Sequence, residues 1–228
     1  MDLTPQEINQ LKGAEGRATR KAMEILVALG TIYGAQRMIP VRSVQIAGVS
    51  YENLGEAGLE FLNEMAEGGG KTRVNTMLNP AGMDIENWRA MGISEEFAEK
   101  QEQVIQAFTR MGVTPTCTCT PYLAGNQPEF GDHIAWAESS AVCYANSVLG
   151  ARTNREGGPS ALAAALTGVT PEYGFHLDEN RIPGISIEVQ ARVEGTDAFG
   201  ALGKAIGQRL EKITPKPVPF LTGIGQAT

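Results

Sequence analysis

The chain has 228 residues, 42% of them hydrophobic, and a formal net charge of −7 at pH 7. A chain of this length buries a sizeable core, as one large domain or about one and a half ordinary ones. The negative charge argues against a nucleic-acid surface, which needs basic residues to neutralise phosphates. No apolar stretch reaches the roughly 18 residues of a membrane helix, and the first residues lack the order of a signal peptide, so we expect a cytoplasmic protein.

Helices and strands are expected to alternate along the first half of the chain. Thr4, Pro5 and Glu7 form a capping box with proline at the first helical position, which predicts a helix start. Further along, composition and periodicity predict a helix over residues 17–29 that stops at Gly30, a strand over 43–47, a helix over 58–66 and a strand over 71–78.

The second half continues this alternation. Ser94 caps the clearest helix, over residues 94–111, whose stripe at helical spacing includes Gln101. Beyond it we expect an extended segment over 113–119, a helix capped by Asp132 and running through residue 149, a helix start at 157–160, a half-buried strand over 185–193 and a helix over 197–210. This order predicts an α/β fold, a layered sheet with flanking helices and with sites at the carboxyl ends of the strands.

Chemically unusual residues are concentrated between positions 114 and 146. Cys117 and Cys119 stand one residue apart, and Cys143 is the third and last cysteine. An odd number of cysteines with this spacing argues against a disulfide scaffold and leaves free thiols or metal ligands. From spacing alone, buried structural thiols and metal ligands are about equally supported for the first two. If these two alternate on a strand, their side chains face the same side.

Two turns and a pair of serines are candidate binding sites for an anion. Gly48, Val49 and Ser50 follow one predicted strand, and Asn79 and Pro80 follow the next. Exposed backbone N–H groups and the serine hydroxyl there suit a carboxylate or phosphate. The alternative is that both segments are ordinary turns without a binding role. Near a helix start, Ser139 and Ser140 either allow close helix packing or receive substrate oxygens.

Other polar residues are weaker candidates. Arg152 and Arg155 are the first choice for anchoring a carboxylate, because a guanidinium group matches it with two parallel hydrogen bonds. Glu138 and Glu156 are candidates for acid–base chemistry. His133 and His176 are assigned no catalytic role, because a lone histidine is more often structural than a base.

An ordered series of segments carries a family resemblance. It comprises GAEG at 13–16, ALGTIYGA at 28–35, IAGVSY at 46–51, LNPAG at 78–82, the region of Cys119, NSVLGARTNREGGPS at 146–160 and HLDENR at 176–181. These segments resemble the large, catalytic subunit of the aconitase X family, closest to members that act on mevalonate 5-phosphate and related to those that act on cis-3-hydroxy-L-proline. The resemblance implies that residues 1–228 are the N-terminal part of an aconitase X catalytic domain with an aconitase-like layered sheet, C-terminally incomplete.

The resemblance also implies an activity. It implies a hydro-lyase that uses an iron–sulfur cluster, of the 4Fe-4S type, as a Lewis acid, with Cys119 as one ligand and the others beyond Thr228. The two turns, with Ser139 and Ser140, would line the substrate pocket, and Cys117 and Cys143 would be packing residues. The substrate would be mevalonate 5-phosphate, an intermediate of isoprenoid biosynthesis, with cis-3-hydroxy-L-proline as the alternative.

The resemblance further implies a partner. A small subunit with a swivelling domain would close over the cluster and supply a serine base, so the chain alone would be inactive. Two other hypotheses stay open. In one, all three thiols bind a single iron cluster; in the other, the chain is a non-catalytic scaffold that binds a metabolite or a partner.

Overall fold

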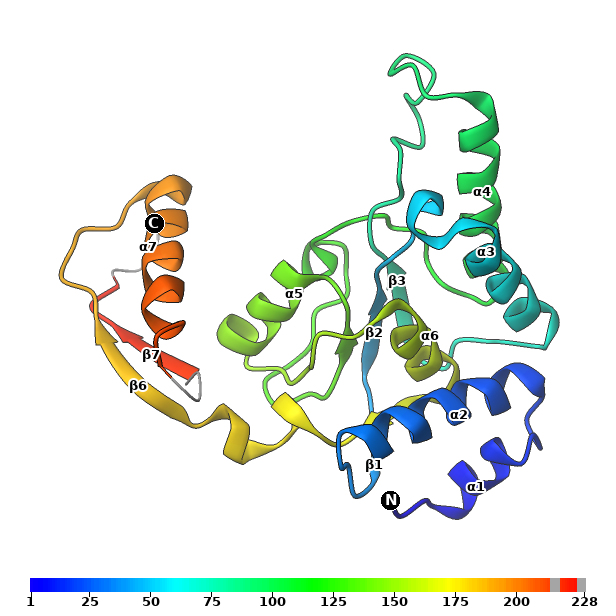
Figure 1. Ribbon diagram of the computed structural model, residues 1–228, viewed down its shortest axis with the longest axis horizontal. Helices are drawn as coiled ribbons and strands as arrows, with labels where there is room; N and C mark the ends of the chain where they lie inside the picture. The colour runs from blue at the N-terminus through cyan, green and yellow to red at the C-terminus, as the bar shows by residue number, and fades with distance from the viewer. Residues whose placement is uncertain (214–217, 225–228) are drawn as a thin grey trace. The chain divides into compact units, whose positions relative to one another are not determined.

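The structure, a computed structural model, describes residues 1–213 and 218–224. The chain forms two compact units, Met1–His176 and Leu177–Thr228, and each is described by itself (Figure 1). Among the described residues, none of the helices combines the length and the apolar character needed to cross a membrane.

The first unit begins with α1 (Pro5–Leu11) and α2 (Arg17–Ile32). The predicted capping box is present, since the Thr4 hydroxyl accepts a hydrogen bond from the Glu7 N–H and the Glu7 carboxylate accepts one from the Thr4 N–H. The prediction that the second helix stops at Gly30 is wrong. A Cβ atom there would lie 2.8 Å from the Met1 sulfur and 3.1 Å from Pro171 Cβ, so this glycine allows close packing within a continuing helix.

A parallel sheet of three strands lies at the centre of this unit. The strands are β2 (Ser43–Ile46), β3 (Asn75–Leu78) and β4 (Ala135–Trp136), in the order β3-β2-β4. Every residue of β2 is buried, as expected for a central strand covered on both faces. The first two strands were predicted, although β3 begins later than expected.

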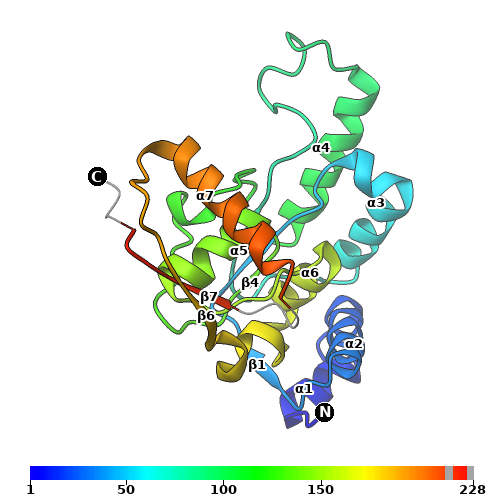
Figure 2. The same ribbon diagram turned by 60° about the vertical axis from the view of Figure 1, so that its left-hand side comes forward.

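Helices enclose this sheet. The helices α3 (Tyr51–Glu67) and α4 (Glu95–Arg110) pack against each other, and α6 (Gly158–Thr167) packs against β2 and α2 (Figures 1 and 2). The α6 helix is buried over almost its whole surface, which is typical of a helix inside a core. Its first turn approaches the end of β2 so closely that a Cβ atom on Gly158 would lie 2.8 Å from the Ala47 carbonyl oxygen.

The predicted helix between residues 132 and 149 is wrong in its first part. Residues 134–137 are buried and contain β4, and only then do α5 (Ser139–Tyr144) and a π-helical turn (Ala145–Leu149) follow. Asp132 caps no helix, because its carboxylate accepts a hydrogen bond from the Glu129 N–H at 2.8 Å and pairs with Arg42 at 3.1 Å. This difference adds the third parallel strand to the sheet.

Smaller elements complete the first unit. An antiparallel pair, β1 (Met38–Pro40) with β5 (Val169–Pro171), was not predicted. Two short 3-10 helices span Pro121–Leu123 and Gly174–His176. The α3 helix starts seven residues before the predicted position 58 and contains a kink at Gly55, where φ is 59°.

The second unit is a β-α-β motif. It starts with a 3-10 helix (Asp178–Arg181), followed by β6 (Pro183–Glu188), α7 (Gly195–Leu210) and β7 (Val218–Thr222), and the two strands are parallel. The first strand ends before residue 193, which the alternating pattern had suggested as its end. The segment after residue 213 contains β7, which was not predicted, and residues 214–217 and 225–228 lie outside the described part of the chain.

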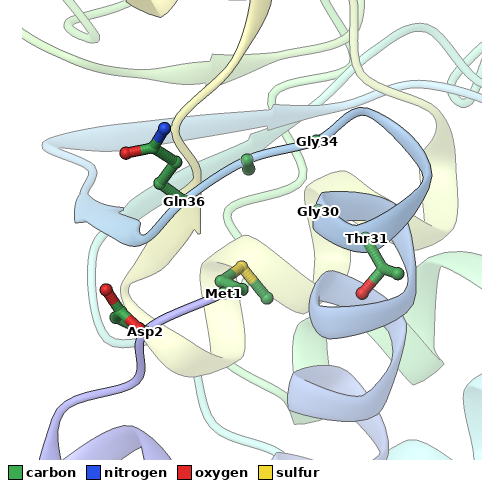
Figure 3. A pocket seen from close by; sticks show the side chains of 7 residues that line it. Met1, Asp2, Gly30, Thr31, Gly34 and Gln36 are labelled. Carbon is green, nitrogen blue, oxygen red and sulfur yellow. The ribbon is translucent and has the colours of Figure 1, made fainter.

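A surface hollow of about 440 Å³ lies at the N-terminal end of the chain, where the Met1 side chain approaches α2 (Figure 3). Its lining is formed by Met1, Asp2, Gly30, Thr31, Gly34, Ala35 and Gln36. None of these residues belongs to a predicted site, and Asp2 is the one charged side chain among them. The hollow therefore gives no reason to move the candidate site from the sheet.

Glu156 is the buried carboxyl group closest to the start of α6. The Ser160 hydroxyl donates a hydrogen bond to Glu156 Oε2 at 2.5 Å, and the Glu156 N–H donates to the Trp136 carbonyl at 2.9 Å. Burial raises the pKa of this carboxyl group, although the hydrogen bond from Ser160 acts in the opposite direction. Glu156 is therefore a structural group turned into the core.

We predict that Glu156→Gln stabilises the protein increasingly as the pH rises. The folded pKa lies above the unfolded value, so the wild-type protein loses stability as the pH rises from the usual carboxyl pKa through the raised folded pKa. The amide does not titrate and avoids this loss. Urea unfolding of both proteins between acidic and neutral pH measures the difference.

Glu172→Gln is the matched control with the opposite sign. Hydrogen bonding and charge pairing with Arg37 hold the pKa of Glu172 below its usual value, so this carboxylate contributes stability that is lost as the pH falls through the lowered pKa. The free energy of unfolding of Glu172→Gln should therefore drop further below that of the wild-type protein as the pH rises. A Glu156→Gln difference that does not change with pH would contradict the assignment.

Candidate functional site

Polar segments follow all three strands of the parallel sheet at the same edge. Residues 47–50 follow β2, Asn79 and Pro80 follow β3, and Glu138 and Ser139 follow β4. Because the carboxyl ends of parallel strands meet at one edge, these segments come together there. This edge therefore gathers the predicted turns and the predicted serine pair.

A direct hydrogen bond joins two of these segments. Asn79 Nδ2 donates to Glu138 Oε2 at 2.7 Å, and the Asn79 N–H donates to the Ile46 carbonyl at 2.9 Å. The Ser139 hydroxyl donates to the other carboxylate oxygen of Glu138 at 3.1 Å. Glu138, a secondary candidate from the sequence, is thus the residue through which the β3 and β4 ends are connected.

The environment of Glu138 favours its charged form. Burial opposes the charge, but hydrogen bonds from Asn79, from the Ser139 hydroxyl and from the N–H groups of Ser140 and Ser139 together lower the pKa of this carboxyl group. The first amides of α5 are therefore directed at Glu138. At neutral pH the site contains a fixed negative charge beside the end of β4.

Cys119 reaches the same edge through a segment that runs beside β3. The Thr114 N–H donates to the Thr76 carbonyl at 2.9 Å, and the Thr118 N–H donates to the Leu78 carbonyl at 3.2 Å. Gln45, fully buried on β2, then ties this segment to β4: its Nε2 donates to the Thr118 carbonyl at 3.1 Å, and its Oε1 accepts from the Glu138 N–H at 3.3 Å. The thiol that follows is placed near Glu138.

The Cys119 thiol is exposed. Partial desolvation and the negative charge of Glu138 both raise its pKa. Both effects disfavour the free thiolate, so a metal bound there would itself have to deprotonate the exposed thiol. Among the described residues, no group of three histidine, cysteine, aspartate or glutamate side chains could hold a metal ion, and Cys119 is the one thiol placed beside Glu138.

The other two cysteines do not join it. Cys117 adopts a φ of 47°, in the left-handed region, so residues 117 and 119 do not alternate on one strand as considered from the sequence. Its thiol is half-buried and accepts a hydrogen bond from the Ala81 N–H, while burial raises its pKa. Cys143 is exposed on α5. Among the described residues the three thiols form no common ligand group, so the three-thiol hypothesis gains no support from the structure.

The loop after β2 approaches the loop after β3. Gly48 has a φ of 75°, and Val49 is buried in the core beneath the loop. Ser50 is the N-cap residue of α3, but its hydroxyl makes no capping hydrogen bond. Any Cβ atom on Gly82 would overlap the Ser50 hydroxyl, so the absence of a side chain there lets the two loops touch.

The histidines and Arg152 lie away from this edge. The Nδ1 atoms of His133 and His176 are 2.9 Å apart, and Arg152 donates to the His176 carbonyl at 3.2 Å. The His133 carbonyl accepts from the N–H of Arg42, which precedes β2, so this group lies at the amino ends of the strands. Arg155 is exposed and Glu156 is buried, and neither contacts the candidate site in a recorded interaction.

Sequence reasoning missed two buried glutamines that hold the site together. Gln45 lies between the apolar residues Val44 and Ile46 of β2, and Gln101 lies in the stripe of α4. Gln101 contacts both the loop after β2 and the loop after β3. The available signal was a polar amide at a position where the pattern calls for an apolar residue.

Comparison with known proteins identifies relatives across the chain. The family model "Aconitase X first domain" matches residues 1–179. The phosphomevalonate dehydratase large subunit of Methanothermobacter thermautotrophicus is 54% identical over 213 residues, covering 93% of this chain and 52% of that protein. That of Thermococcus kodakarensis is 51% identical over 234 residues, covering 100% and 58%. A cis-3-hydroxy-L-proline dehydratase of Hypocrea jecorina is 36% identical over 226 residues, covering 98% and 37%.

A solved structure agrees with the fold. The crystal structure of Thermococcus kodakaraensis aconitase X in its holo-form superimposes with a TM-score of 0.87 at 52% sequence identity, covering 99% of this chain and 55% of that chain. The predicted aconitase-like α/β fold is thereby confirmed. The chain spans about half the length of the phosphomevalonate dehydratase large subunits that it matches. On the family model, the sequence identity and the fold, the chain belongs to the aconitase X family.

Proposed function

We propose that this chain is the first part of the large subunit of a dehydratase that removes water from mevalonate 5-phosphate to give an anhydromevalonate phosphate. The observation that carries the proposal is the meeting of the Ser50 loop, the Asn79–Glu138 pair and Cys119 at one sheet edge. It occurs in a chain more than 50% identical to proteins named phosphomevalonate dehydratase large subunit. The lower identity of 36% to a cis-3-hydroxy-L-proline dehydratase makes that substrate the second choice.

Substrate binding is assigned to the residues around this edge. Gly48, Val49 and Ser50 stand before α3, and the Ser50 hydroxyl, which makes no capping hydrogen bond, can donate to a phosphate or carboxylate. Asn79 and Pro80 form the neighbouring wall. Because Glu138 is anionic, an anionic substrate group is better accommodated by the loop after β2 than beside the carboxylate.

Ser139 and Ser140 have a narrower role in this proposal than in the sequence-based one. Their N–H groups and the Ser139 hydroxyl support the charge of Glu138, and the Ser140 hydroxyl is assigned to the substrate. Both residues are exposed at the start of α5. The Ser139 hydroxyl already donates to Glu138 and can accept a hydrogen bond from a substrate hydroxyl group.

Cys119 is proposed to bind an iron–sulfur cluster, of the 4Fe-4S type, with the remaining ligands outside residues 1–228. When bound, a cluster with an open iron position supplies Lewis-acid activation of the substrate hydroxyl, so that water becomes a feasible leaving group. Glu138 and Asn79 would orient that part of the substrate through hydrogen bonds. The base that removes the proton from the neighbouring carbon is proposed to come from a small partner subunit, and the complete enzyme is proposed to be cytoplasmic.

We predict that Cys119→Ser removes iron and activity together in the complete two-subunit enzyme. The hydroxyl group is a poor substitute for a thiolate ligand, whereas the exposed position should leave the fold largely intact. Iron and sulfide analysis, turnover of mevalonate 5-phosphate and circular dichroism measure the three properties.

Cys143→Ser provides the matched control, since Cys143 is also exposed but lies on α5, and no role as a cluster ligand is proposed for it. Cys143→Ser should retain iron and turnover, and Cys117→Ser should lose much less of both than Cys119→Ser does. Wild-type iron content in Cys119→Ser would refute the ligand assignment. A complete enzyme that binds mevalonate 5-phosphate without turnover would instead favour the scaffold hypothesis.

We also predict that Ser50→Ala and Ser140→Ala weaken substrate binding. Each variant removes one hydroxyl from the proposed pocket, which should cost roughly 0.5–3 kcal/mol for a hydrogen bond to a charged group. Isothermal titration with mevalonate 5-phosphate measures the loss. Ser147→Ala is the control, because the Ser147 hydroxyl donates to the Cys143 carbonyl within its own helical segment; equal losses in all three variants would argue against the pocket.

A further inference from the structure

We infer that Gln101 is a positioning residue that fixes the separation of the two loops carrying Ser50 and Asn79. The inference rests on the proposed function for its meaning in catalysis, but the contacts that support it belong to this chain alone. Gln101 lies on α4 and is fully buried. No contact between Gln101 and the substrate is proposed, and its effect is exerted through the backbone of the two loops, including the Val49 carbonyl.

The side-chain amide of Gln101 makes three hydrogen bonds. Its Nε2 donates to the Val49 carbonyl at 2.9 Å. Its Oε1 accepts from the Tyr51 N–H at 3.0 Å and from the Gly82 N–H at 3.0 Å. The orientation of the amide is set by these partners, because the reverse orientation would place its NH₂ group against two N–H donors.

These partners belong to two different strand ends. Val49 and Tyr51 flank Ser50 in the loop after β2, and Gly82 lies three residues after Asn79 in the loop after β3. The last backbone hydrogen bond recorded between these strand ends joins the Asn79 N–H to the Ile46 carbonyl. Beyond that bond, Gln101 connects the backbones of the two loops.

A packing role alone does not account for a glutamine here. Its neighbours along the same face of α4, Ala98, Val104 and Phe108, are buried and apolar. Burying an amide is costly unless its donors and acceptors are satisfied, and a leucine would fill the same space without that requirement. The amide of Gln101 instead supplies hydrogen-bond partners for the Val49 carbonyl and for the N–H groups of Tyr51 and Gly82.

Gly82 completes the arrangement. A Cβ atom on this residue would overlap the Ser50 hydroxyl and lie 2.9 Å from Gln101 Oε1. The lack of a side chain therefore lets the Gly82 N–H reach the glutamine while the Ser50 hydroxyl lies against the same backbone. Gln101 and Gly82 together hold the Ser50 hydroxyl close to the segment that carries Asn79.

Gln101→Glu tests the inference through its pH dependence. A glutamate carboxylate still accepts from the two N–H groups but cannot donate to the Val49 carbonyl, and it places a negative charge against that oxygen. The protonated carboxyl group restores the donor. Burial favours the protonated form of the new carboxyl group, whereas the N–H groups of Tyr51 and Gly82 favour the carboxylate, so the pH at which the variant regains wild-type behaviour reports the balance of the two effects.

In the complete two-subunit enzyme, the KM of Gln101→Glu for mevalonate 5-phosphate should exceed the wild-type value at about pH 8, where the new carboxyl group is ionised. The increase should be on the order of tenfold to 100-fold, the scale of a small misplacement of binding groups. The ratio of variant to wild-type KM should fall toward one as the pH is lowered. Gln101→Leu should show the increase at every pH.

Val104→Ala is the matched control, since Val104 is buried on the same helix and makes no hydrogen bond through its side chain. It should lower the melting temperature without a pH-dependent change in KM. If Val104→Ala raises KM as much as Gln101→Glu does at about pH 8, or if Gln101→Leu leaves KM unchanged, the inference is overturned.

Amide hydrogen exchange separates this inference from the proposed function. In Gln101→Leu the N–H groups of Tyr51 and Gly82 lose their acceptor, so their protection factors should fall at least about tenfold relative to those of Val104→Ala. This result is expected whether or not mevalonate 5-phosphate is the substrate. Unchanged protection at both residues would overturn the inference, and a protein with reduced protection but no turnover of mevalonate 5-phosphate would instead overturn the proposed function.

Discussion

The parallel pairing of β2 with a strand on each side is the constraint on which the candidate site depends. Since β2 pairs with both β3 and β4 in the same direction, three chain segments leave the sheet at one edge. Each segment then contributes polar groups to a small region. An antiparallel β4 would have sent Glu138 and Ser139 to the opposite edge, where Arg42 and His133 lie.

Two buried glutamines convert this pairing into a defined arrangement of loops. Gln45 connects the Cys119 segment with the start of α5, and Gln101 connects the loops after β2 and β3. Both amides bond mainly to backbone groups, which loops expose where regular pairing ends. The geometry of the site therefore depends on buried core residues that have no contact with a substrate.

Local sequence signals predicted the helices better than the sheet. The capping groups of Thr4 and Ser94 are present as expected, because a cap depends on neighbours within the same turn. The β4 strand was missed because two residues give no periodic pattern, and its apolar neighbours continue into a real helix. Gly30 was misread as a helix end because its role depends on Met1 and Pro171, which are distant in sequence.

The site was predicted in its segments but not in its contacts. The family resemblance pointed to the two turns, to Ser139 and Ser140, and to Cys119, and the structure brings these segments to one sheet edge. Nothing in the sequence indicated that Asn79 would bond Glu138, since 59 residues separate them. The conformation of Cys117, with its positive φ, was equally inaccessible to a pattern that assumed a regular strand.

The charges at this edge divide it into two parts. The amides at the start of α5 face Glu138 and keep it ionised, so that side of the edge is negative. The other part is the loop after β2, where the Ser50 hydroxyl is not used for capping. A substrate with an anionic end and a hydroxyl group fits this division in one direction, with its anion at α3 and its hydroxyl toward Glu138 and Cys119. The orientation proposed for the substrate thus follows from the position of Glu138, whose negative charge already occupies the start of α5.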